Sequence, residues 1–350
     1  MRVKLGDVCE RGTSNLKLSD VSEKNGEFSV FGASGYIGSV DFYQQGYPYV
    51  AVVKDGAGIG RAMLCPGKTS VIGTMQYLLP KDNILPKYLF YVVKYMNLEK
   101  YFTGATIPHI YFKDYKNEEF NFDFWERQVE IVSVLSKCEK VIDLCKQELQ
   151  LLDKLIKARF VELFGDPVSN SYGLPEATLP DLGEFGRGVS KHRPRNDIKL
   201  LGGKYPLIQT GDVANAGLYI TSYSSTYSEL GLKQSKMWDK GTLCITIAAN
   251  IAKTAILEFD ACFPDSVVGF IANERTNNIF VHYWFSFFQA ILESQAPESA
   301  QKNINLKILS ELKVIVPEKR KQDQFASFVK LTDKSGFVER FPEFSLFYRL

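Results

Sequence analysis

The sequence repeats itself at a constant offset of 194 residues. The matched positions are His109-Ile110 with Asn303-Ile304, Phe112 with Leu306, Gln128 with Gln322, Ile131 with Phe325, and Glu139-Lys140 with Asp333-Lys334. In both copies, a polar stretch leads into a short apolar segment and then into a helix-like segment with glutamine near its start. A period this long indicates duplicated domains rather than a solenoid, whose repeats span ~20–50 residues. The pattern therefore predicts two similar modules with two equivalent binding sites.

Length and charge agree with two domains but say little about partners. The 350 residues suffice for two cores at the usual ~100–200 residues per domain. Lys and Arg (42) almost balance Asp and Glu (40), which leaves a net charge of +2. Because a nucleic-acid footprint depends on where cations cluster, their local distribution matters more than this total.

The cysteine, histidine and apolar patterns exclude several classes of protein. The six cysteines form no Cys-x-x-Cys pair, and the three histidines show no metal-ligand spacing. We therefore expect free thiols in a reducing compartment, and neither a metal nor a cofactor in this chain. The N-terminal residues lack the apolar run of a signal peptide, and no window reaches ~18 consecutive apolar residues. The sequence predicts a soluble cytoplasmic protein without a membrane partner.

Each module combines short strand-like runs with a helix-like segment, which predicts an α+β fold. In the first module the pattern predicts strands at 28–32, 47–53 and 76–79 and a helix at 86–101. In the second it predicts strands at 205–208, 241–247 and 313–317 and a helix at 281–293. The expected division is 1–123 for the first module, 124–165 for a spacer helix, 166–317 for the second module, and 318–350 for a short helix with an atypical tail.

The segment between the modules carries apolar residues at alternating steps of four and three, which is typical of a coiled-coil seam. The seam consists of Ile131, Leu135, Cys138, Ile142, Cys145, Leu149, Leu152 and Ile156, with Leu163 beyond an interruption at Arg159. We predict one helix from about Trp125 to Phe164, roughly 60 Å long at 1.5 Å per residue. Balanced charges outside the seam predict a solvated exterior. The alternative is a long core helix of one large domain.

The second copy of this helix is shorter than the first. It begins near residues 317–319 and continues through Phe325, Val329 and Thr332, but Gly336 and Pro342 end it early. The tail at 337–350 is aromatic and has no helical period. A complete duplication would give a much longer helix lying antiparallel to the first.

Ordered sequence runs carry a family resemblance. In the first module they lie at 31–38 (FGASGYIG), 53–61 (VKDGAGIGR) and 71–75 (VIGTM), and in the second at 207–213 (LIQTGDV), 231–235 (GLKQS) and 248–254 (AANIAKT). Their order, followed each time by a helix that begins near a glutamine, resembles the specificity subunit of type I restriction–modification enzymes. The resemblance covers residues 3 to about 335.

The resemblance implies a DNA-recognition subunit with no catalysis of its own. Its two target recognition domains would each read one half of a split sequence on double-stranded DNA, with the helices between them acting as a ruler. The ruler would set the half-sites around one turn of DNA apart, ~34–36 Å between centres, or somewhat more. Two methylation subunits would supply S-adenosylmethionine, and restriction subunits would use ATP and Mg. The short second helix leaves open a truncated or rearranged subunit that needs a second copy.

Candidate DNA contacts are cations for phosphates and polar side chains for base edges. They are Lys54, Arg61, Lys68, Thr106, His109 and Tyr111 in the first module, and Arg187, Lys191, Arg193, Arg195, Gln209, Asn250, Lys253, Lys302 and Asn303 in the second. The alternative is that the basic run at 187–195 is a solvated loop, that 56–60 is only a tight hairpin, and that the Asn and Gln residues satisfy their own turns.

Two other classes of function stay open. One is a protein–protein adaptor that uses the same loops, and the other is a self-sufficient DNA-modifying enzyme whose active site carries no known motif. The run at 62–69 fits a loose phosphate-loop pattern, but the strand-like residues after it argue against the helix that such a loop needs. We expect no nucleotide site there.

Overall fold

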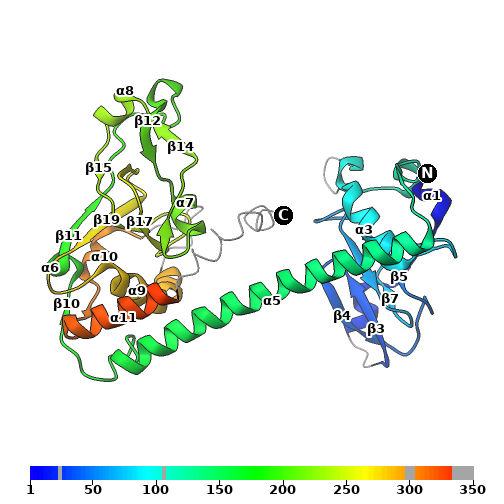
Figure 1. The fold of residues 1–350 in the computed structure, drawn as a ribbon, viewed down its shortest axis with the longest axis horizontal. Helices are drawn as coiled ribbons and strands as arrows, with labels where there is room; N and C mark the ends of the chain where they lie inside the picture. The colour runs from blue at the N-terminus through cyan, green and yellow to red at the C-terminus, as the bar shows by residue number, and fades with distance from the viewer. Residues whose placement is uncertain (23–25, 105–107, 296–303, 333–350) are drawn as a thin grey trace. The chain divides into compact units, whose positions relative to one another are not determined.

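The computed structural model describes residues 1–22, 26–104, 108–295 and 304–332. The chain divides into two compact units, Met1–Cys145 and Lys146–Leu350 (Figure 1). Helices and strands mix in each unit, which confirms the α+β class. Helix α5 (Trp125–Phe164) has the bounds that the heptad pattern predicts, and it contributes residues to both units.

The first unit is built from three small sheets and one long helix. Its elements are β1 (Arg2–Lys4), α1 (Leu5–Val8), β2 (Cys9–Thr13), α2 (Leu18–Ser22), β3 (Phe28–Gly32), β4 (Gly35–Val40), β5 (Tyr49–Val53), β6 (Ala62–Cys65), β7 (Ser70–Val71), β8 (Met75–Pro80), α3 (Pro86–Met96), a 3₁₀ turn (Leu98–Tyr101), α4 (Phe112–Tyr115) and β9 (Glu119–Asn121). The sheets have the strand orders β2-β8-β5-β6, β4-β3-β7 and β1-β9.

Strand β5 is buried on both faces because it lies between two layers. Val50 and Val52 belong to the core that includes Leu89 of α3, whereas Tyr49 and Ala51 pack on the side of the sheet that holds Val71 of β7. Alternate side chains of a strand point to opposite faces, so one short run of apolar residues supplies both cores. Helix α3 ends at Met96, before the predicted end, because Asn97 takes a left-handed conformation (φ 48°) and a 3₁₀ turn follows.

The second unit has more strands and a second long helix. Its elements are β10 (Glu176–Ala177), α6 (Leu179–Leu182), β11 (Gly183–Arg187), a 3₁₀ turn (Ile198–Leu200), β12 (Leu201–Leu207), α7 (Thr210–Asn215), β13 (Tyr219–Ile220), β14 (Ser225–Tyr227), α8 (Glu229–Lys233), β15 (Met237–Trp238), β16 (Leu243–Thr246), β17 (Thr254–Leu257), β18 (Ala261–Cys262), β19 (Val267–Ala272), α9 (Asn278–Gln295), α10 (Leu306–Glu311), β20 (Val314–Ile315) and α11 (Lys319–Leu331). The sheets have the orders β11-β19-β16-β17-β13, β14-β12-β18-β15 and β10-β20.

The two units share one topology. The order β2-β8-β5-β6 in the first corresponds to β11-β19-β16-β17 in the second, and the parallel pair β3–β7 corresponds to the parallel pair β12–β18. Individual hydrogen bonds repeat as well. The Ile110 amide donates to the Lys54 carbonyl (2.9 Å), and the Ile304 amide donates to the Ile247 carbonyl (3.0 Å). The duplication read from the sequence is therefore a duplication of structure.

The end of α5 is part of the second unit's core. Phe160 stacks on Phe280 of α9 at 5.3 Å between ring centroids and meets Phe325 of α11 edge-on at 5.3 Å. In Figure 1 this end of α5 lies beside α9 and α11. A shorter C-terminal helix therefore packs against α5, as the sequence predicts. Gly336 and Pro342, expected to end α11, lie outside the described residues.

A fully buried glutamine anchors the start of each long helix. Gln128 in α5 donates to the carbonyls of Asn83 (3.0 Å) and Asp123 (2.9 Å) and accepts from the Leu85 amide (2.9 Å). Gln322 in α11 makes the matching set, donating to the carbonyls of Arg275 (3.0 Å) and Pro317 (2.8 Å) and accepting from the hydroxyl of Thr276 (2.8 Å). Each side chain thus ties a helix to the connections of its own unit.

The middle of α5 shows more exposed apolar surface than the sequence predicts. Of the seam residues, Ile156 is buried (1%), whereas Leu135 is 37% exposed and Cys138 is also exposed. Beside the seam, a further set of apolar side chains is exposed, namely Val134, Val141, Leu144, Leu151 and Leu155. The charge balance did not reveal this apolar face, because it says nothing about where the remaining apolar residues point. Coiled-coil pairing of the central seam stays a prediction.

The buried glutamines give a test of the two anchors. Gln128→Leu removes three hydrogen bonds and leaves partly buried backbone groups without their partner, at up to about 1–3 kcal/mol each. We expect the first unit to lose at least about 2 kcal/mol of unfolding free energy, and Gln322→Leu to weaken the second unit similarly. Segment-resolved hydrogen exchange measures each unit separately. The control Gln147→Leu, at an exposed position of α5, should change stability by no more than about 0.5 kcal/mol. Unchanged exchange in Gln128→Leu would contradict the anchor.

Candidate nucleic-acid interface

The first candidate residues gather at the loop between β5 and β6, residues 54–61. Three glycines in this loop have left-handed backbone conformations: Gly56 (φ 88°), Gly58 (φ 81°) and Gly60 (φ 80°). Because side chains with a Cβ rarely adopt such angles, the glycines permit the tight path of the loop. The Gly56 amide donates to the carbonyl of Pro108 (3.0 Å), which joins the loop to the polar segment before α4. The candidate residues of the loop, Lys54 and Arg61, therefore lie on the same surface as the segment that carries His109 and Tyr111.

Asp55 holds two of the candidate side chains in place. Its carboxylate meets Nδ1 of His109 at 2.7 Å and Nζ of Lys54 at 3.4 Å. The His109 ring stacks on Tyr111 (6.3 Å between centroids), and Nζ of Lys113 lies 5.4 Å from the centre of the Tyr111 ring. Asp55 lies in the run at 53–61 that carries the family resemblance, but neither Asp55 nor Lys113 was among the candidate DNA contacts. Lys54, predicted to contact a phosphate, and His109, predicted to reach a base edge, thus share an anionic partner that DNA would have to displace or accommodate.

The second unit carries the equivalent loop at residues 247–253. The Val53 amide donates to the Arg61 carbonyl (3.0 Å) in the first unit, and the Thr246 amide donates to the Lys253 carbonyl (2.9 Å) in the second. Asn250 is exposed on this loop and Lys253 is half-buried. The loop uses alanine where the first uses glycine, since Ala249 (φ 63°) and Ala252 (φ 57°) are left-handed. Such conformations cost about 1 kcal/mol or more and concentrate at functional sites.

Most of the basic run of the second unit forms a loop tied down by acidic and polar partners, but Arg187, predicted to lie on the loop, is the last residue of strand β11 and pairs with Val268. Asp265 accepts from Nη2 of Arg193 (3.3 Å) and from Nη2 of Arg195. The His192 amide donates to Oε1 of Gln234 (3.0 Å). Arg193 and Arg195 are therefore held on a carboxylate, which occupies the position that a phosphate would take between two guanidinium groups.

Other groups in this loop have unused hydrogen-bonding capacity. Oγ of Ser190 and Nε2 of Gln234 are buried and have no hydrogen-bond partner among the described residues. The amide of Lys199 and the His192 ring both lower the pKa of the Asp197 carboxyl, the amide having the larger effect. Asp197 thus stays ionised and keeps its side of the loop acidic.

The candidate cations differ in their electrostatic surroundings. Within the described part of the chain, Lys54, Arg193 and Arg195 have acidic partners, and no ion pair is seen for the other candidate cations, which are Arg61, Lys68, Arg187, Lys191 and Lys253. Lys68 is exposed in the turn after β6, and Gln209 is exposed at the start of α7. Thr106, Lys302 and Asn303 lie outside the described residues.

The phosphate-loop pattern at 62–69 does not form a phosphate loop. Residues Ala62–Cys65 are strand β6, Ser70–Val71 are strand β7, and no helix begins between or directly after them. The described residues contain no group of three or more His, Cys, Asp or Glu side chains placed to hold a metal ion. None of the described helices is both long and apolar enough to cross a membrane.

Comparison with known proteins decides the family. The profile of the type I restriction modification DNA specificity domain matches the chain twice, over residues 1–154 and 176–337. The chain belongs to this family. It is a DNA-recognition subunit of a type I restriction–modification system, and such specificity subunits are not catalytic. The resemblance drawn from the ordered sequence runs is confirmed.

Individual relatives agree with this assignment. The putative type I restriction enzyme MjaX specificity subunit of Methanocaldococcus jannaschii is 22% identical over 299 residues, covering 81% of this chain and 70% of that protein. The MjaIX specificity subunit of the same organism is 26% identical over 179 residues, or 46% of this chain and 40% of that protein. The crystal structure of the type I S subunit from M. genitalium has the same fold, with a TM-score of 0.61 and 17% identity over 96% of this chain and 89% of that one.

The two ion pairs that Asp265 makes with Arg193 and Arg195 provide a test of the basic loop. Asp265→Asn removes the carboxylate that holds Arg193 and Arg195, so both guanidinium groups become available to DNA phosphates. We expect affinity for duplex DNA to rise several-fold at low salt, and the slope of log affinity against log salt to steepen by about one unit per added phosphate contact. Fluorescence anisotropy across a salt series measures both. The control Glu162→Gln makes the same charge change on α5 and should leave the slope unaltered. If the two variants behave alike, the loop does not meet DNA.

Proposed function

We propose that this chain reads a bipartite sequence on duplex DNA, each unit contacting one half-site. The repeated loop carries the proposal, because the hairpin at 54–61 and its counterpart at 247–253 occupy the same place in two copies of one topology. Each loop ends in a cation, Arg61 or Lys253, that directly precedes an equivalent strand. Two equivalent surfaces suit two half-sites, since phosphate contacts fix register and side chains beside them reach base edges.

Helix α5 would act as the ruler between the half-sites. It has no Gly or Pro between Trp125 and Phe164, and its two ends are packed in different cores. A helix of this length spans roughly 60 Å at 1.5 Å per residue, which leaves room for a spacer that neither unit contacts. The gap between half-sites would then be a property of α5.

We further propose that the exposed apolar side chains of α5 dock the methylation subunits. Val134, Val141, Leu144, Leu151 and Leu155 recur along one side of the helix, next to the seam. Exposed apolar surface of this kind marks protein–protein contact more often than it marks a DNA surface, which is polar and basic. In the assembled enzyme, S-adenosylmethionine would belong to the methylation subunits, and ATP and Mg to the restriction subunits.

Exchange of the first module tests the bipartite reading. Residues 1–123 are replaced by the corresponding residues of another family member, and the hybrid is co-expressed with its methylation subunit. Genome-wide mapping of methylated adenines should then show a change in one half-site and no change in the other. The unexchanged chain serves as the control. If both half-sites change together, the units do not read independently; if no methylation pattern depends on the chain, the adaptor alternative is favoured.

A further inference from the structure

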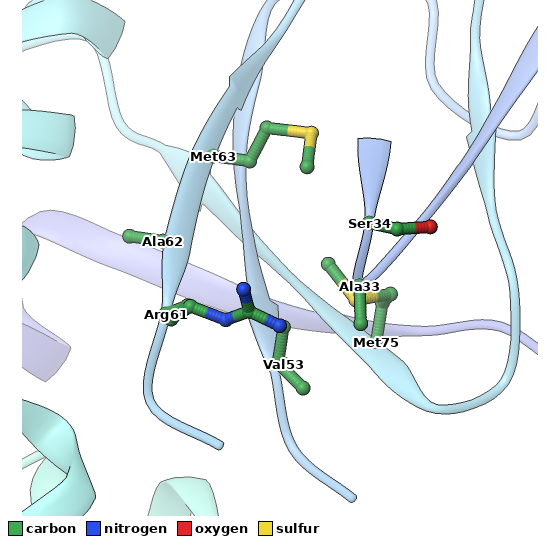
Figure 2. Close-up of a pocket in the computed structure, with 7 residues that line it drawn as sticks. All are labelled: Ala33, Ser34, Val53, Arg61, Ala62, Met63 and Met75. Carbon is green, nitrogen blue, oxygen red and sulfur yellow. The ribbon is translucent and has the colours of Figure 1, made fainter. Parts of the chain in front are cut away.

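A pocket opens in the first unit beside Arg61 (Figure 2). Its volume is about 240 Å³, and five of its seven lining residues are apolar, although polar atoms make up more of its exposed surface; the lining consists of Ala33, Ser34, Val53, Arg61, Ala62, Met63 and Met75. Val53 and Met75 pair across β5 and β8 and are both buried, and β6 is the edge strand of the sheet. The turn between β3 and β4 contributes Ala33 and Ser34. Arg61 is the one charged residue among these seven.

The backbone holds the Arg61 guanidinium at this pocket. Nε of Arg61 donates to the carbonyl of Gly58 (3.3 Å), and Figure 2 shows the guanidinium directed toward Val53. A Cβ at position 58 would lie 2.2 Å from Nε and 2.3 Å from Nη2, so any other residue there would displace the Arg61 side chain from this position. With Nε engaged, the two Nη groups remain for a ligand. The hairpin therefore presents a planar, two-pronged donor at the mouth of the pocket.

The surroundings of Arg61 favour a base edge over a phosphate. A phosphate needs several polar donors around its oxygens, and among the lining residues only Ser34 and Arg61 carry polar side chains. Guanine instead offers two adjacent acceptors, O6 and N7, which match the spacing of a guanidinium fork. Building on the proposed function, we infer that Arg61 reads a guanine in the first half-site, with the base edge seated against Met63 and the pocket rim.

The second unit has different chemistry at the same place. Lys253 stands where Arg61 does, and the pocket residues Val53 and Ala62 correspond to Thr246 and Thr254 by strand pairing and hydrogen bonding. A lysine is a compact point charge and lacks the fork that recognises two acceptors at once. The equivalent position in the second unit is therefore not a guanine reader of this kind, so any Arg61 effect should fall on one half-site alone.

Three variants test the inference. The full chain with its methylation subunit is incubated with a randomised duplex library, and bound and methylated sequences are read for the wild type, Arg61→Lys, Arg61→Gln and Lys253→Gln. We expect a guanine in the wild-type first half-site. Arg61→Lys keeps the charge but loses the fork, so preference for that guanine should fall about 5- to 150-fold while the salt dependence of binding stays the same. Lys253→Gln should leave the first half-site unchanged. Because both positions lie in loops beside strands, folding is checked by hydrogen exchange of β5 and β6 for the Arg61 variants and of β16 and β17 for Lys253→Gln.

The outcomes separate this inference from the proposed function. If Arg61→Lys retains the wild-type preference, or Arg61→Gln weakens all duplexes equally and lowers the salt slope by about one, Arg61 contacts a phosphate and the inference is wrong. A wild-type first half-site without guanine also overturns it. In each of these cases a two-part wild-type site would still support the proposed function, whereas a wild type with no two-part preference refutes that function itself.

Discussion

The uninterrupted helix α5 is the constraint on which the rest of the structure depends. Its first turns bury Gln128 and pack Ile131 against the core of the first unit, and its last turns bury Phe160 and Phe164 in the core of the second. Between these ends the helix has no core of its own, and its stability there rests on good helix-forming residues and the absence of Gly and Pro. Packing at both ends supplies the stability that an isolated helix lacks in water.

The duplication extends from the sequence to single hydrogen bonds. Gln128 and Gln322 each donate to two carbonyls near the start of a helix, and Ile110 and Ile304 each donate to the first residue of the repeated loop. In each unit, the loop is consequently fixed relative to the helix that Gln128 or Gln322 anchors. The chemistry carried on the loops has diverged, with glycines and Arg61 in one and alanines and Lys253 in the other. This combination of a repeated scaffold with altered loops is what a protein needs to read two different half-sites.

The sequence predicted most of the scaffold because its signals are local or periodic. The heptad seam predicts both ends of α5, and the offset that pairs Gln128 with Gln322 predicts where α11 begins. The site was predicted less well because its partners are distant in sequence. Nothing in the basic run reveals that Asp265 holds Arg193 and Arg195, and nothing near His109 reveals Asp55. The exposed apolar side of α5 was missed for another reason, since charge balance describes composition and not the direction in which Leu144 or Leu151 points.

The most direct test changes the length of α5 and measures the spacer between the two half-sites. Four residues inserted after Gln147, an exposed position in mid-helix, would add roughly 6 Å at 1.5 Å per residue while keeping the helix intact. The altered chain is co-expressed with the methylation subunit, and the spacer between its methylated half-sites is compared with that of the wild type. The account predicts the same two half-sites separated by a spacer longer by about one to two base pairs, given a rise of about 3.4 Å per pair. Unchanged half-sites at an unchanged spacing would contradict it.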